Sequence, residues 1–275
     1  MSDISTQQLQ QKTLPILLAI DKVCREHDIH YYISDGTMLG AVRHGGFIPW
    51  DDDLDIAMPR PDYERFVAQG SEWLPEPYEM ICVEKNPYEA CTFMKIIDGG
   101  TTLIERWSYN QLGGIYIDVF PIDGVSKNKR WRHLRFSLYR LLNRLTYLRN
   151  RDPYKRGKGA SSWLPRLLQA TVSNATLHRW MHSLQTAHGY DESEYVADYD
   201  SGERGVMLKE VIGQMKPVLF EGHEVMGVAK PDEYLRHLYG DYMQIPPENK
   251  RRIHNFDYVD LAHSYHDYHD TRKFK

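Results

Sequence analysis

Helical and strand-like hydrophobic patterns alternate along the first part of the chain. Residues 5–27 predict an amphipathic helix, because their apolar side chains recur three or four positions apart. Ser5 and Gln8 form a capping-box pattern at its start, and Pro15 is expected to kink or restart it. Short apolar runs then predict strands at residues 31–33, 54–58, 78–83, 92–97 and 115–120.

Helices are predicted between these strands and after them. One covers residues 37–43, another begins at Pro61, and later ones cover 163–188 and 231–238. Strands separated by helices indicate an α/β (α+β) fold, a mixed sheet flanked by helices with an added helical C-terminal part. We expect a catalytic core over residues 1–125. Residues 126–275 would pack on it as a basic helical region and C-terminal part, with a flexible tail after about 260.

The charge pattern changes abruptly after residue 126. Between residues 127 and 158, twelve Lys and Arg residues accompany a single acid, Asp152. An apolar stripe at helical spacing lies opposite most of the arginines: Trp131, Leu134, Leu138, Leu141, Leu142, Leu145 and Leu148. The pattern favours a helix that packs through its leucines and exposes arginines such as Arg132, Arg140, Arg144 and Arg151. Such a basic face could also contact anionic lipid or attract a phosphate-bearing acceptor.

Composition narrows the class of protein. The chain has 275 residues and a net charge of −4, so overall charge gives no case for nucleic-acid binding. The three cysteines, an odd number without CxxC spacing, argue against disulfides and zinc ribbons and favour a cytoplasmic location. The first residues lack a signal-peptide pattern, and no apolar run approaches ~18 residues, so we expect no membrane span.

Three aspartates are the candidate metal ligands. On a strand over residues 54–58, Asp53 and Asp55 are two positions apart and therefore point to the same face. Two such carboxylates repel each other unless a cation lies between them, and Mg²⁺ or Mn²⁺ prefers oxygen ligands. Asp118 is the one acid in an otherwise apolar strand and would complete the site. Asp51 is a lesser candidate, and an acidic run such as 51–53 is more often a solvated loop.

A glycine turn supplies the second candidate feature. Gly36 and Thr37 lie between a predicted strand and a predicted helix. Glycine lets a phosphate approach the backbone closely, the helix N-terminus offers free N–H groups, and the Thr37 hydroxyl adds a hydrogen bond. A turn, a helix N-terminus, a metal and carboxylates together are what phosphoryl transfer requires.

These segments resemble the LicD family, which includes the fukutin-related proteins. The resemblance is strongest over residues 36–44 (GTMLGAVRH) and 47–56 (FIPWDDDLDI), and it continues at 95–98, 117–123, 220–222, 234–235, 239–243 and 246–251. Asp35 departs from the pattern, because many members have glycine there. The resemblance implies a nucleotidyltransferase-type fold and places the metal acids at Asp53 and Asp55, with Asp118 as the third carboxylate.

The resemblance also implies an activity. It implies transfer of phosphocholine from CDP-choline to a hydroxyl of a cell-surface glycan, with release of CMP. Arg43 and Lys95 are candidate phosphate ligands, and a surface salt bridge is the alternative for each. A related cargo (phosphoethanolamine, aminoethylphosphonate or ribitol phosphate) and a non-catalytic glycan-binding relative stay open. The acceptor would be lipopolysaccharide, teichoic acid or a capsular repeat, on a lipid carrier at the inner face of the membrane.

Two further patterns are ambiguous. Tyrosines such as Tyr116, Tyr199, Tyr239 and Tyr242 could form a cage for a trimethylammonium group, but most tyrosines belong to the core or surface. Three histidines near the C-terminus have a spacing that suggests a metal site, although a polar tail is the simpler interpretation: His263, His266 and His269.

Overall fold

The computed structural model describes residues 4–86, 89–105, 112–153, 162–251 and 256–269. The α-helices are α1 (Thr6–Glu26), α2 (Asp35–His44), α3 (Arg60–Trp73), α4 (Lys129–Asn150), α5 (Trp163–Thr171), α6 (Asn174–Gln185), α7 (Lys209–Ile212) and α8 (Pro231–Tyr239). The strands are β1 (Tyr32–Ile33), β2 (Asp55–Pro59), β3 (Tyr78–Ile81), β4 (Met94–Ile104), β5 (Leu112–Val125), β6 (Tyr195–Ala197), β7 (Met207–Leu208), β8 (Lys216–Phe220), β9 (His223–Gly227) and β10 (Tyr258–Asp260). Short 3₁₀ helices are η2 (Gly202–Gly205), η3 (Glu248–Lys250) and η4 (Tyr265–Asp267).

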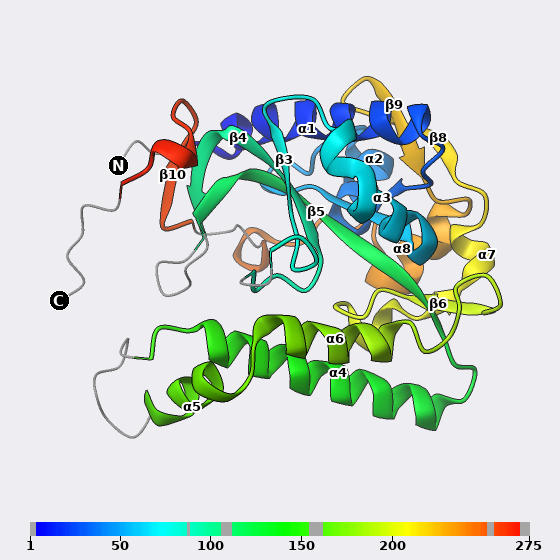
Figure 1. Ribbon diagram of the computed structural model, residues 1–275. Coiled ribbons are helices and arrows are strands. Elements are labelled where there is room, and N and C mark those ends of the chain that lie inside the picture. The colour runs from blue at the N-terminus through cyan, green and yellow to red at the C-terminus, as the bar shows by residue number, and fades with distance from the viewer. Residues whose placement is uncertain (1–3, 87–88, 106–111, 154–161, 252–255, 270–275) are drawn as a thin grey trace.

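A mixed sheet lies at the centre of the molecule, with helices α1, α2 and α3 on one side and α4, α5 and α6 in a separate layer (Figure 1). Its main strand order is β1-β2-β5-β4-β10, while β3 pairs with β4, and β6 pairs with β5 and β7. Strands β2 and β5 run parallel, and the other pairs in this sheet run antiparallel. The mixed α/β architecture predicted from the sequence is therefore confirmed.

Helix α1 shows how local pattern and packing agree. The Ser5 side chain and Gln8 form the predicted capping box, and the helix continues through Pro15 without restarting. Its apolar face is fully buried at Ile16, Leu17 and Ile20, and it joins one core cluster with the inner residues of the sheet. Burial of such side chains contributes about 1.5–3 kcal/mol each. This core fixes the strands whose polar residues form the site.

The first part of helix α4 packs through a different side from the predicted one, whereas Leu142 and Leu145 of the predicted stripe pack against the second core cluster. Its buried residues are Phe136, Tyr139 and Thr146, which join a second core cluster with α6 and β6. The Tyr139 hydroxyl and the Asn143 amide donate hydrogen bonds to the Asp200 carboxylate, and these contacts orient the helix. The first part of the leucine stripe is exposed instead of buried. The prediction that the leucines form the packing face was therefore wrong for this part of the helix. Phe136 and Tyr139 pack in the second core cluster instead, and Tyr139 also forms a hydrogen bond with the buried Asp200.

The C-terminal segment packs on the sheet, at least as far as residue 269. Strand β10 pairs with β4, and the Tyr265 hydroxyl donates a hydrogen bond to Glu79. His263 contacts Asp260, and His266 contacts Glu79. Polar side chains in the segment thus find partners on the sheet, and the flexibility expected after about residue 260 stays a prediction. The boundary proposed at residues 125 and 126 stays a prediction, and strands from both sides of it share one sheet.

Candidate active site

A row of polar side chains crosses three neighbouring strands at the centre of the sheet. In the parallel β2–β5 pair, Asp55 lies opposite Asp118. In the antiparallel β4–β5 pair, Lys95 lies opposite the same Asp118. Neighbouring strands are about 4.8 Å apart, so residues in register project side by side. The structure thus brings together Asp55, Asp118 and Lys95, which the sequence proposes separately, with Asp53 two positions before Asp55.

The carboxylates in this row are crowded. Burial raises the pKa of Asp55 well above its ordinary value, and the neighbouring charges of Asp53 and Asp118 raise it further. Burial also raises the pKa of Asp118 to about 6, although Lys95 acts in the opposite direction. A cation between these oxygens would relieve the repulsion that raises the pKa values. The donor set is all oxygen, which suits a hard divalent ion such as Mg²⁺.

Lys95 is a buried partner of the carboxylates. Its Nζ forms an ion pair with Asp118 Oδ1 at 3.2 Å and donates a hydrogen bond of 2.7 Å to Glu105 Oε1. The same Nζ lies 3.4 Å from the centroid of the Tyr116 ring. Lys95 is therefore not in a surface salt bridge, the alternative weighed for it. It places one positive charge beside the acids, and its role toward phosphate stays a prediction.

The N-terminus of α2 lies against the same group of residues. Thr37 Oγ1 accepts a hydrogen bond from the Asp55 backbone N–H at 2.8 Å, so it ties the helix start to β2. A Cβ at Gly36 would lie 2.8 Å from Asp51 Oδ2, so the absence of a side chain lets this carboxylate approach. The first-turn N–H groups of a helix have no intrahelical partners and favour anions. The geometry is compatible with a phosphate at this helix start.

Arg43 lies near the other end of α2. Its Nη1 donates a hydrogen bond of 2.8 Å to the Tyr242 carbonyl, which links α2 to the C-terminal 239–243 segment. Burial lowers the pKa of Arg43, and the charge of Asp51 acts in the opposite direction. Arg43 is thus within electrostatic reach of the acidic loop. A direct phosphate contact for it stays a prediction.

The structure adds two acids that the sequence analysis missed. Asp198 and Asp200 follow β6 and belong to the same acidic neighbourhood as Asp118 and Asp35. Burial and Asp198 raise the pKa of Asp200 to about 7. Asp198 and Asp200 directly follow β6 and have the same D-x-D spacing as Asp53 and Asp55. This spacing is a signal from which the two acids could have been identified.

The acidic loop before β2 is itself a possible ligand set. One carboxylate oxygen from each of Asp51, Asp52 and Asp53 lies within 4.8 Å of the others. Asp52 is buried, although the sequence analysis gave it no role. The candidate metal ligands therefore fall into two overlapping sets that share Asp53, one along the loop and one along the strands.

A hairpin far along the chain holds the loop that leads into these acids. Strands β8 and β9 turn at Glu221 and Gly222, both with positive φ. The Glu221 carboxylate accepts a hydrogen bond of 2.9 Å from the Phe47 N–H, and the Glu221 N–H donates one of 3.0 Å to the Gly45 carbonyl. This explains why the 220–222 motif accompanies the motif at 47–56: the two segments are in direct contact.

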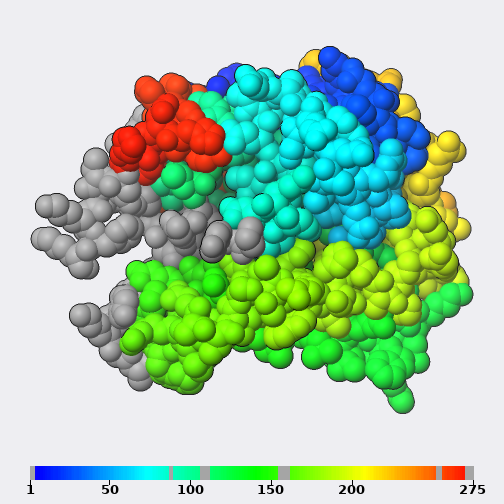
Figure 2. All heavy atoms as spheres, in the orientation of Figure 1, coloured from blue at the N-terminus to red at the C-terminus, as the bar shows by residue number. Residues whose placement is uncertain are grey.

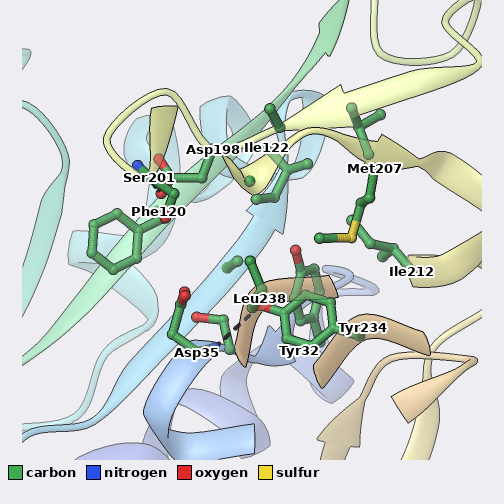
Figure 3. Close-up of a pocket in the computed structure, with 15 residues that line it drawn as sticks. Tyr32, Asp35, Phe120, Ile122, Asp198, Ser201, Met207, Ile212, Tyr234 and Leu238 are labelled. Atoms are coloured by element: carbon green, nitrogen blue, oxygen red, sulfur yellow. Dashed lines mark hydrogen bonds between the residues drawn. The ribbon is translucent and has the colours of Figure 1, made fainter. Parts of the chain in front are cut away.

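A narrow pocket opens beside the start of α2 (Figure 3). Tyr32, Tyr234 and Phe120 contribute aromatic walls, and Asp35 and Asp198 contribute carboxylates. The Asp35 backbone has a positive φ of 43°, and its N–H donates a hydrogen bond of 3.1 Å to the Tyr234 hydroxyl. Burial and Asp198 raise the pKa of Asp35 to about 7. The pocket thus combines aromatic faces with excess negative charge.

Comparison with known proteins links this site to a family. Residues 28–140 match the LicD/FKTN/FKRP nucleotidyltransferase domain. The chain is 29% identical over 271 residues to the lipopolysaccharide cholinephosphotransferase LicD of Haemophilus influenzae, an alignment that covers 93% of this chain and 97% of the relative. A shorter match, 54% identical over 41 residues, links it to an uncharacterised protein of Rickettsia typhi and covers 15% of this chain and 13% of the relative. Another, 57% identical over 37 residues, is to an uncharacterised protein of Rickettsia prowazekii and covers 14% of each chain. The family match contains α2, β2, β4 and β5, the elements that carry the polar row.

Proposed function

Because the chain carries a LicD-family nucleotidyltransferase domain, we propose that it transfers phosphocholine from CDP-choline to a hydroxyl of a cell-surface glycan and releases CMP. The observation that carries the proposal is the row of Asp55, Asp118 and Lys95 beside the N-terminus of α2. Phosphoryl transfer depends on positioning and charge neutralisation, and this row offers groups for both.

The metal would be Mg²⁺ or Mn²⁺ held by Asp53, Asp55 and Asp118. The fit rests on the oxygen-only donor set and on the raised pKa values of Asp55 and Asp118, which indicate crowded carboxylates without enough positive charge. When bound, the ion would neutralise diphosphate charge and stabilise the charge of the transition state.

The chain's own residues perform the remaining steps. The acceptor hydroxyl oxygen forms a bond to the phosphorus next to choline, the bond from that phosphorus to the CMP oxygen breaks, and the electron pair leaves with CMP. Asp118 takes the hydroxyl proton, and Asp53 is the second candidate for this role. The backbone of Gly36 and Thr37 and the charge of Lys95 orient the diphosphate.

The pocket in Figure 3 supports choline as the cargo. A trimethylammonium group is attracted to aromatic faces and to carboxylates, and Tyr32, Tyr234, Phe120, Asp35 and Asp198 supply both. As it stands the pocket is too small for a trimethylammonium group, so the lining side chains would have to move apart to admit it. An uncharged polyol such as ribitol could donate hydrogen bonds to the two carboxylates but would gain no ionic or cation–π attraction, whereas ethanolamine would keep the charge but lose the methyl contacts.

The acceptor and the place of action follow from the same proposal. We place the protein in the cytoplasm, in line with three buried cysteines that form no disulfide, and against the inner face of the membrane, where a lipid-linked lipopolysaccharide or teichoic-acid precursor would be the acceptor. None of the helices in the described part of the chain has the length and apolar character that a bilayer-spanning segment requires. The proposed membrane contact is therefore peripheral.

A competition experiment tests the donor. Purified protein is given a glycan acceptor, Mg²⁺ and equal concentrations of CDP-choline, CDP-ethanolamine and CDP-ribitol, and the products are separated by mass. We expect the choline product to dominate by up to about thirtyfold, since cation–π attraction contributes ~0.5–2 kcal/mol. A ribitol product in excess would contradict the choline assignment, and the absence of any product with every donor would contradict the transferase assignment.

A further inference from the structure

The outer side of α4 is an exposed apolar stripe. Large side chains at positions 131, 134, 138 and 141 are exposed over much of their surface: Trp131 (61%), Leu134 (46%), Leu138 (41%) and Leu141 (53%). Spacings of three, four and three residues place all four on one side of an α-helix. Phe136 and Tyr139, which are buried, lie on the other side. The stripe is thus not part of either core cluster.

Positive charge accompanies this stripe. Helix α4 contains six arginines and one lysine and no acidic residue. Arg130, Arg140 and Arg144 are exposed along the same helix. Arg130 and Arg144 lie one helical turn from Leu134 and Leu141 and border the stripe, while Arg140 lies farther round the exposed side of the helix. An exposed apolar stripe bordered by arginines, on a helix without acids, is the pattern of a helix that lies at a lipid surface.

The rest of the helical layer has the same character. Helix α5 exposes Trp163 (59%) and Leu167 (48%), and α6 exposes Trp180 (49%). Tryptophan favours the boundary between lipid and water, because its ring is apolar and its N–H is polar. Helices α4, α5 and α6 form one flank of the molecule (Figures 1 and 2). Large apolar side chains on one flank of a protein mark an interaction surface.

We propose that the outer side of α4, hereafter the α4 stripe (Trp131, Leu134, Leu138 and Leu141 with Arg130, Arg140 and Arg144), docks on an anionic lipid bilayer. A symmetric contact between two copies would bring the arginine-rich helices together, and their like charges would repel. An anionic bilayer instead offers apolar depth for the leucines and negative head groups for the arginines. Charge complementarity therefore favours the lipid surface over a second copy of the chain.

Docking on this side would bring the bilayer close to the candidate active site. The inner side of α4 contacts Asp200 through Tyr139 and Asn143. Asp200 in turn belongs to the acidic neighbourhood of Asp118. One helix with its side chains is about 10–12 Å thick. The lipid surface would therefore lie about 10–12 Å from Asp200. The inference uses the proposed function only for its lipid-linked acceptor; the docking surface itself rests on exposure and charge.

Vesicle binding tests the proposal. Purified protein is sedimented with vesicles of phosphatidylglycerol and phosphatidylcholine, and with vesicles of phosphatidylcholine alone. We expect binding to the anionic vesicles that weakens as salt is added. A variant with Leu134→Ser, Leu138→Ser and Leu141→Ser should bind at least tenfold more weakly. Replacing Arg130, Arg140 and Arg144 with Gln should weaken binding to anionic vesicles about a hundredfold.

A matched control changes apolar residues elsewhere on the surface. Leu219→Ser, Met243→Ser and Ile245→Ser remove side chains that are 63%, 55% and 52% exposed and belong to other elements. This control should bind vesicles as the unaltered protein does. All variants should keep their activity on a soluble acceptor fragment, which separates a failure of docking from a failure of the proposed reaction.

Three results would overturn the proposal. The first is an unaltered protein that ignores anionic vesicles at low salt. The second is a triple Leu→Ser variant that binds them as tightly as the unaltered protein. The third is a dimer, detected by light scattering, that dissociates in the Leu→Ser variant and does not bind vesicles; this would assign the stripe to a second copy.

Discussion

Replacing Asp35 with Asn should make the protein more stable and less selective for its donor. The Asp35 carboxylate is half-buried beside Asp198, and burial with that neighbour raises its pKa from 3.8 to about 7. A shift of this size corresponds to roughly 4 kcal/mol, at 1.36 kcal/mol per pH unit. Asn is neutral, has the same shape and tolerates the positive φ of 43°. Losing an acid at a helix N-terminus costs about 0.3–1 kcal/mol, so the net gain is about 3 kcal/mol.

The sign of the effect fixes its pH dependence. Because the pKa of Asp35 is higher in the folded than in the unfolded state, the unfolded chain loses its proton first as the pH rises. The free energy of unfolding of the unaltered protein therefore falls between about pH 4 and about pH 7, and the Asn variant lacks this part of the fall. Below about pH 4 both forms are neutral at this position and the gain vanishes.

Urea unfolding followed by tryptophan fluorescence, from about pH 4 to about pH 8, measures the difference. Asp28→Asn is the matched control, because Asp28 also has a positive φ of 53° but is exposed. Its stability should change by less than about 0.5 kcal/mol. The Asp35 variant should also lose part of the preference for CDP-choline over CDP-ribitol. A stability difference independent of pH, or a less stable variant at high pH, would contradict a raised pKa for Asp35.

Three other substitutions test contacts around the site. Arg60→Met leaves the buried Asp123 carboxylate without its two 2.7 Å hydrogen bonds and should cost about 3–5 kcal/mol in urea unfolding; a loss below about 1 kcal/mol would contradict the role of this pair. Glu221→Ala removes the acceptor for the Phe47 N–H and should raise KM for the donor while the melting temperature falls only slightly; an unchanged KM would show that the loop does not need this contact. Tyr139→Phe removes a hydrogen bond that lowers the pKa of Asp200, so that pKa should rise, and any limb of the rate profile that reports Asp200 should move to higher pH.

Local pattern was sufficient to predict the strands that carry the candidate metal ligands. The alternation around Asp53 and Asp55, and the single acid at Asp118, located two strands, and the structure places these strands side by side in register. The helix α2 was also predicted, but the expected turn at Gly36 was wrong, because the helix begins at Asp35 and Gly36 lies in its first turn. These predictions needed only residues close together in the chain.

Contacts between distant segments were not predictable from a single sequence. Asp200 reaches the site only because β6 pairs with β5, and Tyr139 and Asn143 hold it from a helix about 60 positions earlier. The same contacts decide which side of α4 is buried. The leucine stripe has the stronger periodic signal, but Phe136 and Tyr139 have the better partners. Periodicity identifies an amphipathic helix without saying which of two apolar sides faces the core.

Release of CMP from CDP-choline by the purified protein measures the proposed transfer itself. The assay contains a glycan acceptor, Mg²⁺ and either the unaltered protein, Asp55→Asn or Asp118→Asn, with melting temperatures measured in parallel. We expect CMP and phosphocholine-bearing acceptor in equal amounts, no product with a chelator, and loss of product in both variants with the fold intact. Asp55→Asn that retains full activity would contradict this expectation.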